Sequence, residues 1–262
     1  MITIIRIAEI NIKINHSYKY IPALCKDYIY QGSDYDFEIN ITEDEILDEI
    51  NKSTEYDFPK WYAEGIVCYR KICHELYRFD AIMIHSSAIS YQNECYLFTA
   101  RSGTGKTTHT RLLYEYLKGE VKYVNGDKPI IRRINNIFYV YGTPWNGKEN
   151  LGENVKVPLK ALVFLERSEH NSVTTFDKKD LIKKIIPSII MPTGDEEVNK
   201  TFNILSDVID AIDTYTLKCN MDIEAAVVSS KEILKKRLWK NLLIRFGFTA
   251  LFNLFEKYSS KL

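Results

Sequence analysis

The sequence predicts a mixed α/β fold whose main sheet is largely antiparallel. The segments that look like strands are short and follow one another through tight turns such as Asn135-Asn136, with few helices between them. One strand, loop and helix stand in direct succession at residues 95–117, where an apolar run precedes a glycine-rich loop and helically spaced leucines follow it. We therefore expect a mixed α+β arrangement, with a helical C-terminus.

The first 80 residues are expected to form an α+β segment that packs on the rest of the chain. Hydrophobic alternation, clearest at Ile10-Asn11-Ile12-Lys13-Ile14, predicts strands. An acidic stretch after Thr42, which is a suitable N-cap residue, predicts a short helix. The expected elements are strands at 2–14 and 27–41 and helices at 43–49 and 59–77.

Residues 81–234 are expected to form the core of the fold. An apolar run at 81–89 predicts a strand, and Tyr91-Gln92-Asn93-Glu94 turns the chain back into the strand that enters the glycine-rich loop. Beyond the loop helix, which Gly119 is expected to end, further short segments follow. They are strands at 121–125, 129–134, 137–141, 159–166 and 215–219, and helices at 177–190, 195–212 and 222–236.

Composition narrows the class of protein. Lysine plus arginine and aspartate plus glutamate both number 35, so the formal net charge of zero gives no indication of a nucleic-acid partner. Five scattered cysteines favour free thiols in a reducing compartment over a disulfide framework or a zinc site. We expect no signal peptide, because Arg6, Glu9 and Lys13 interrupt the first apolar run, and no apolar stretch reaches membrane-spanning length. We expect a cytoplasmic protein.

The stretch Ala100 to Thr108 fits the phosphate-binding loop pattern, with alanine in the first glycine position. Glycines permit the backbone to wrap around an anion, and the loop opens a helix whose N-terminus favours phosphate. Lys106 supplies positive charge to the β- and γ-phosphates, and Thr107 offers a hydroxyl to Mg²⁺. The candidate ATP-binding residues are Arg101, Ser102, Gly103, Thr104, Gly105, Lys106, Thr107 and Thr108.

A loop of this kind works with a carboxylate near the metal, and two acids qualify. Glu166 ends the strongly apolar run 161–165, whereas Asp127 lies in the polar turn Asn125-Gly126-Asp127-Lys128-Pro129. From these residues alone the choice stays open. His85 precedes the loop by one hairpin and is a candidate for accepting a proton or binding a phosphate, with a buried histidine bonded to backbone as the alternative.

Two further regions carry candidate binding residues. Residues 141–148 form a glycine-punctuated loop in which Trp145 is expected to be exposed as a binding lip, unless the loop is only a surface turn. Arg101, Arg132 and Lys148 are candidates for stabilising charge on the γ-phosphate. The basic amphipathic tail at 235–262 is expected to be helical. Its apolar face is expected to pack on this chain or on a second copy, with binding to a partner protein or to a membrane surface as the alternatives.

The order of His85-Ser86-Ser87-Ala88, the loop and Gly126-Asp127 resembles the HPr kinase/phosphorylase and phosphoenolpyruvate carboxykinase superfamily. The resemblance covers about residues 81–170. It implies a carboxykinase-like P-loop core, makes Asp127 the acid near the metal and the attacking hydroxyl, and matches His85 to the histidine that precedes the loop in the kinases. It thus favours Asp127 over Glu166. The family has two adjacent acids after this strand, whereas here Gly126 and Lys128 flank the single Asp127.

These expectations combine into one functional prediction. The chain is expected to be an ATP- and Mg²⁺-dependent kinase that phosphorylates a hydroxyl on a peptide, a protein or a small molecule. Asp127, His85 and Lys106 are the expected catalytic residues, and Thr107 with Asp127, or alternatively Glu166, the metal ligands. The alternative is a regulatory module that binds ATP without transferring its phosphate.

Overall fold

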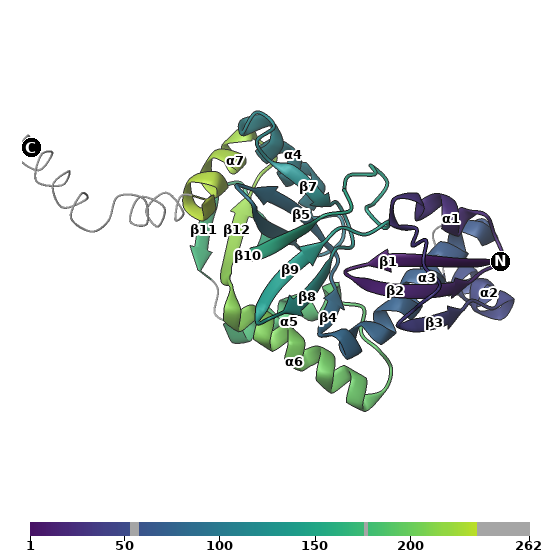
Figure 1. Cartoon of the computed structure of the whole chain (residues 1–262). Helices are drawn as coiled ribbons and strands as arrows, with labels where there is room; N and C mark the ends of the chain where they lie inside the picture. The colour runs from purple at the N-terminus through teal and green to yellow at the C-terminus, as the bar shows by residue number, and fades with distance from the viewer. Residues whose placement is uncertain (53–57, 176–177, 235–262) are drawn as a thin grey trace, which may run out of the picture.

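A computed structural model describes residues 1–52, 58–175 and 178–234 of the chain (Figure 1). Within these residues the strands form a three-stranded sheet, in the order β1-β2-β3, and a nine-stranded sheet. The smaller sheet and its helices lie to one side of the larger sheet (Figure 1). The tail predicted at 235–262 lies outside the described residues.

The smaller sheet begins with a hairpin where one strand over 2–14 was predicted. Strands β1 (Ile2–Ile7) and β2 (Ile10–Asn15) pair antiparallel, because Ala8 and Glu9 adopt positive φ angles of 51° and 61° and turn the chain. Strand β3 (Phe37–Asn40) pairs parallel with β2 and is the only strand in the predicted range 27–41. Helices α1 (Tyr20–Leu24), α2 (Glu43–Lys52) and α3 (Lys60–Glu75) accompany this sheet.

The larger sheet is mixed and mostly antiparallel, as predicted. Its main path runs β4-β8-β9-β10-β6-β5-β7, and β12 pairs with both β10 and β11. Only the pairings of β10 with β6 and with β12 are parallel, so the carboxyl ends of these three strands meet at one edge. The strands are β4 (Ala81–Met83), β5 (Ser86–Tyr91), β6 (Glu94–Thr99), β7 (Lys122–Asn125), β8 (Ile130–Ile134), β9 (Ile137–Tyr141), β10 (Lys156–Arg167), β11 (Ser172–Thr175) and β12 (Asp213–Cys219).

Helices cover both faces of the larger sheet (Figure 1). One buried cluster includes residues of α4 (Lys106–Tyr116) and α7 (Ile223–Ser229), and another those of α5 (Lys178–Ile185) and α6 (Asp195–Ala211). The helix predicted at 177–190 ends early, since Pro187 lacks an N–H and the chain continues as a 3₁₀ turn. The helix predicted at 222–236 changes to a π-helical turn at Ser230. No helix in the described ranges is long and apolar enough to cross a membrane.

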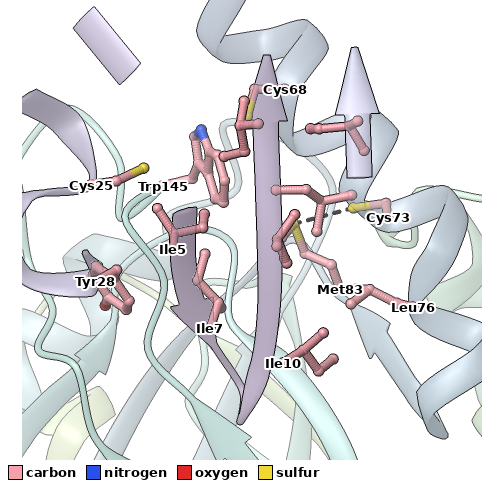
Figure 2. Close-up of a cluster of buried hydrophobic side chains, with 14 of the residues drawn as sticks. Ile5, Ile7, Ile10, Cys25, Tyr28, Cys68, Cys73, Leu76, Met83 and Trp145 are labelled. Carbon is pink, nitrogen blue, oxygen red and sulfur yellow. Dashed lines mark hydrogen bonds between the residues drawn. The ribbon is translucent and has the colours of Figure 1, made fainter. Parts of the chain in front are cut away.

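A common core joins the smaller sheet to the larger one. Ile5, Ile7 and Ile10 of the first hairpin belong to the same buried cluster as Met83 of β4 and Trp145 (Figure 2). Trp145 follows β9 and is only 8% exposed, which corrects the prediction of an exposed binding lip. Its indole N–H donates to the carbonyl of Gly65 at 3.1 Å, and its ring meets that of Tyr69 edge-on. The loop after β9 is thereby fixed to α3.

Replacement of Trp145 by alanine tests this connection. We expect W145A to lower the free energy of unfolding by about 3 kcal/mol, because it empties a buried site between the two sheets. Urea unfolding measures the change. The matched control is W61A, since Trp61 is 44% exposed and its loss should cost less than about 1 kcal/mol. Equal effects of the two substitutions would contradict the shared core.

Candidate functional site

The glycine-rich loop connects β6 to α4, as predicted. Gly103 and Gly105 have φ angles of 74° and 114°, values that disfavour any residue with a side chain. The N–H of His109 makes an intrahelical bond to the carbonyl of Gly105 at 2.9 Å, so the amides of the first helical turn precede the hydrogen-bonded ladder. A helix start of this form presents free N–H groups and the positive end of the helix dipole to an anion.

Arg167 holds the loop from the neighbouring strand. Its guanidinium donates to the carbonyl of Gly103 and, at 3.4 Å, to that of Thr104. Arg167 reaches the loop because β10 runs parallel to β6 and ends at the same edge of the sheet. Sequence analysis missed this residue, since the contact depends on a pairing between strands about 60 residues apart.

Lys106 is buried at the start of α4. Its side chain is only 8% exposed, and no hydrogen bond or ion pair joins its ammonium group to another described residue. Burial lowers the pKa of Lys106, while the nearby negative charge of Asp127 opposes that shift. A buried ammonium without a partner is costly, so this position is suited to an anion that supplies the missing charge.

The turn that carries Asp127 is built around Asn125 at the end of β7. The side-chain oxygen of Asn125 accepts from the backbone N–H groups of Asp127 at 2.8 Å and Lys128 at 2.7 Å. Its amide nitrogen donates to the carbonyl of Thr143 at 3.0 Å. A Cβ at Gly126 would lie 2.8 Å from the carbonyl oxygen of Asn146, which leaves room only for glycine. Sequence analysis missed Asn125, although Asn-Gly-Asp is typical of such side-chain-stabilised turns.

The Asp127 carboxylate has a cationic or polar partner on each oxygen. His85 Nε2 lies 2.9 Å from Oδ1, and the Lys128 ammonium contacts Oδ2. Because a carboxylate only accepts hydrogen bonds, Nε2 must carry the proton in this contact. Burial by itself raises the pKa of Asp127, but the His85 hydrogen bond and the Lys128 charge outweigh it and hold that pKa well below its usual range.

His85 occupies a break between two strands. The run 81–89 was predicted as one strand, yet β4 pairs with β8 and β5 pairs with β6 and β7. Between them, the His85 N–H donates to the carbonyl of Ser188 at 2.7 Å, and the His85 carbonyl accepts from the Thr99 hydroxyl at 3.1 Å. The next N–H, that of Ser86, donates to the carbonyl of Asp127 at 2.9 Å. The break therefore directs His85 toward Asp127.

Two pockets meet at the His85–Asp127 pair. The first, of about 760 Å³, lies on the loop side and is lined by His85, Glu166 and the loop residues Arg101, Ser102 and Thr104. We call it the loop-side pocket. The second, of about 660 Å³, is lined by Thr107, Asp127 and several aromatic side chains, and we call it the aromatic pocket. The structure thus places Thr107 with Asp127 in one pocket and Glu166 in the other.

The remaining predicted site residues are dispersed. Glu166 pairs with the Lys184 ammonium at 2.5 Å, and Lys148 lines the aromatic pocket. Gly105 and Thr108 line a third pocket of about 500 Å³. Arg132 is not a candidate for charge stabilisation, because its guanidinium donates to the carbonyls of Phe79 and Ala8 and joins the two sheets. In the described part of the chain, no group of three or more His, Cys, Asp or Glu side chains gathers as a metal site.

Fold and site together define a mixed α/β protein with a glycine-rich strand–loop–helix beside a partly buried His–Asp pair. No protein-family model matches the chain, and no curated protein matches it in sequence. Among solved structures it is similar to the HPr(Ser) kinase/phosphatase from Coxiella burnetii. The identity is 11%, the TM-score is 0.34, and the match covers 63% of this chain and 98% of the other. Because this similarity is distant, the functional argument rests on the site itself.

The depressed pKa of Asp127 predicts a pH-dependent contribution to stability. The unfolded carboxyl binds its proton at a higher pH than the folded one, so Asp127 stabilises the fold above about pH 4 and loses this effect as the pH falls. D127N should therefore lose less stability than the wild type between pH 5 and pH 3, because only the wild type has the Asp127 carboxyl to protonate. Urea midpoints at the two pH values measure this difference.

The control for this experiment is D207N. Asp207 is a half-exposed partner of Arg133, and surface pairs of this kind contribute little to stability. Its pH dependence should follow that of the wild type. A D127N profile that also follows the wild type would show that the carboxylate is not stabilised by its partners.

Proposed function

We propose that this protein is an ATP- and Mg²⁺-dependent kinase that transfers the γ-phosphoryl group to an alcohol. The observation that carries the proposal is the buried ammonium of Lys106 at the start of α4, which has no hydrogen-bond or ion-pair partner among the described residues and follows a loop with two glycines of positive φ. Triphosphate oxygens would neutralise the positive charge of Lys106 and accept hydrogen bonds from the amides of the first turn of α4. Arg167 would hold the loop carbonyls in place during this binding.

The residues at the site fit a magnesium ion. Mg²⁺ in kinases neutralises charge on the β- and γ-phosphates and is held by one or two protein groups together with phosphate oxygens and water. Thr107 and Asp127 line one pocket and are the residues that would hold it. Such a site does not require a larger cluster of acidic side chains.

Asp127 also suits the role of proton acceptor. In the proposed transfer, the acceptor oxygen forms a bond to the γ-phosphorus, the bond to the ADP oxygen breaks, and the hydroxyl proton passes to Asp127. His85 and Lys128 each occupy one position on the carboxylate, and further lone pairs on both oxygens stay available. The low pKa of Asp127 keeps the group ionised and oriented, so positioning contributes more than basicity.

One observation favours a second candidate function. The resembled superfamily has two adjacent acids after this strand, whereas here Gly126 and Lys128 flank the single Asp127, and the Lys128 ammonium pairs with its carboxylate. A protein that binds ATP only to regulate a partner would need no free carboxylate. Incubation with γ-labelled ATP separates the two functions, because a regulatory module binds the nucleotide and yields no labelled product.

Replacement of Lys106 by alanine tests the proposed nucleotide site. K106A removes the only buried cation of the loop helix, so we expect phosphoryl transfer from γ-labelled ATP to fall at least about 100-fold while the protein stays folded. The control is K122A on β7, where Lys122 is exposed and turnover should not change. Unchanged turnover in K106A would refute the proposed function.

Two isosteric substitutions compare the two candidate acids. We expect D127N to lower kcat at least about 100-fold, and E166Q to lower it less than about 10-fold, because Asp127 lines the same pocket as Thr107 whereas Glu166 lines the other pocket. Steady-state kinetics at varied Mg²⁺ concentration measure both effects. A larger loss in E166Q than in D127N would assign the principal acidic role to Glu166.

A further inference from the structure

The aromatic pocket differs in character from the loop-side pocket. The loop-side pocket contains cationic side chains, including Arg101, Arg167 and Lys184, which suit phosphate oxygens. The aromatic pocket is lined by three tyrosines together with polar and charged residues from the turn after β7 and the loop after β9. Because Asp127 lines one pocket and its partner His85 lines the other, the carboxylate lies at the point where two bound molecules would meet.

One face of α3 provides the aromatic wall. Tyr62, Gly65, Ile66 and Tyr69 stand at positions i, i+3, i+4 and i+7, and all four line the pocket. Tyr20 of α1 completes this wall above Gly65, where an added Cβ would come within 2.8 Å of the tyrosine ring. Gly65 is therefore required for the ring of Tyr20 to lie against α3.

Polar groups line the same pocket as the tyrosines. Among them are Asp127 and Lys128, and the Lys128 ammonium lies 5.1 Å from the centre of the Tyr69 ring. The loop after β9 adds the side chains of Asn146 and Lys148. Burial raises the pKa of Tyr20 and of Tyr69, so both phenols keep their hydrogen-bond donors at neutral pH. Aromatic rings thus line the same pocket as carboxylate, amide, ammonium and phenol groups.

This composition indicates the kind of molecule that the pocket accepts. A volume of about 660 Å³ falls within the range of small-molecule sites, about 300–1,000 Å³, and does not admit a folded protein domain. Aromatic faces pack against the C–H faces of a ring, and the surrounding donors and acceptors suit several hydroxyl groups. A monosaccharide-sized cyclic polyol combines both features.

We propose that the aromatic pocket is the acceptor site of the kinase and that its occupant is a cyclic polyol of monosaccharide size. The ring packs on Tyr62 and Tyr69, and one hydroxyl reaches Asp127. That hydroxyl oxygen bonds to the γ-phosphorus of ATP, ADP leaves, and the hydroxyl proton passes to Asp127. The inference rests on the proposed function and adds the acceptor class and the residues that select it.

The experiment uses the full chain with Mg²⁺ and γ-labelled ATP. The acceptors are a panel of cyclic polyols, namely hexoses, pentoses and inositol, and in a parallel arm a pool of serine-containing peptides. We expect label on at least one polyol and a KM for it that rises at least about 10-fold in Y62A. Y62F keeps the ring and should stay within about threefold of the wild type. The matched control is Y116A, since Tyr116 is exposed on α4 outside the pocket.

The outcomes separate this inference from the proposed function. ATP binding by calorimetry, with K106A as reference, tests the nucleotide site alone and should stay within about twofold of the wild type in Y62A. A protein that binds ATP but labels only peptides, or whose polyol KM is the same in Y62A and Y116A, would overturn the acceptor assignment and leave the kinase proposal intact. A protein that binds no ATP would overturn both.

Discussion

The carboxylate of Asp127 is partly buried where three parts of the chain meet, and its charge constrains all of them. A buried charge is tolerated only with partners, because its desolvation costs several kcal/mol. Here the partners are His85, from the break between β4 and β5, and Lys128, which also lies over Tyr69 of α3. The side chain of Asn125 holds the backbone of the turn. The position of this one acid therefore depends on β5, β7 and α3 together.

The smaller sheet takes part in the same arrangement. Its isoleucines, together with Trp145 and Met83, form one core that spans both sheets, so α3 cannot move without disturbing the loop after β9 (Figure 2). This core fixes the spacing between the tyrosine wall and the Asp127 turn. The N-terminal residues are thus part of the candidate site, even though the glycine-rich loop lies entirely in the larger sheet.

Local chemistry explains which features the sequence predicted. The residue types of Gly103, Gly105 and Lys106 are enough to indicate a glycine-rich loop before a helix. Tight turns such as Asn135-Asn136 indicated the antiparallel sheet. The features that were missed depend on distant contacts. The run 81–89 is apolar throughout, so its periodicity gives no sign of the break at His85. Trp145 stands between residues typical of a surface loop, and only its contact with Gly65, 80 positions earlier, shows that it is buried.

The two candidate acids differ most in how firmly they are held. Glu166 pairs with a lysine whose side chain is 42% exposed, and such a pair is worth little and is easily exchanged for another ligand. Asp127 is held on both oxygens by partners that are themselves partly buried, and moving it would leave the Lys128 ammonium and the His85 N–H without their acceptor. A group that must present one fixed lone pair to a hydroxyl benefits from the second arrangement. The exposed pair of Glu166 with Lys184 does not fix a lone pair in this way. Of the two acids, Asp127 therefore has the arrangement that the proposed proton acceptor needs.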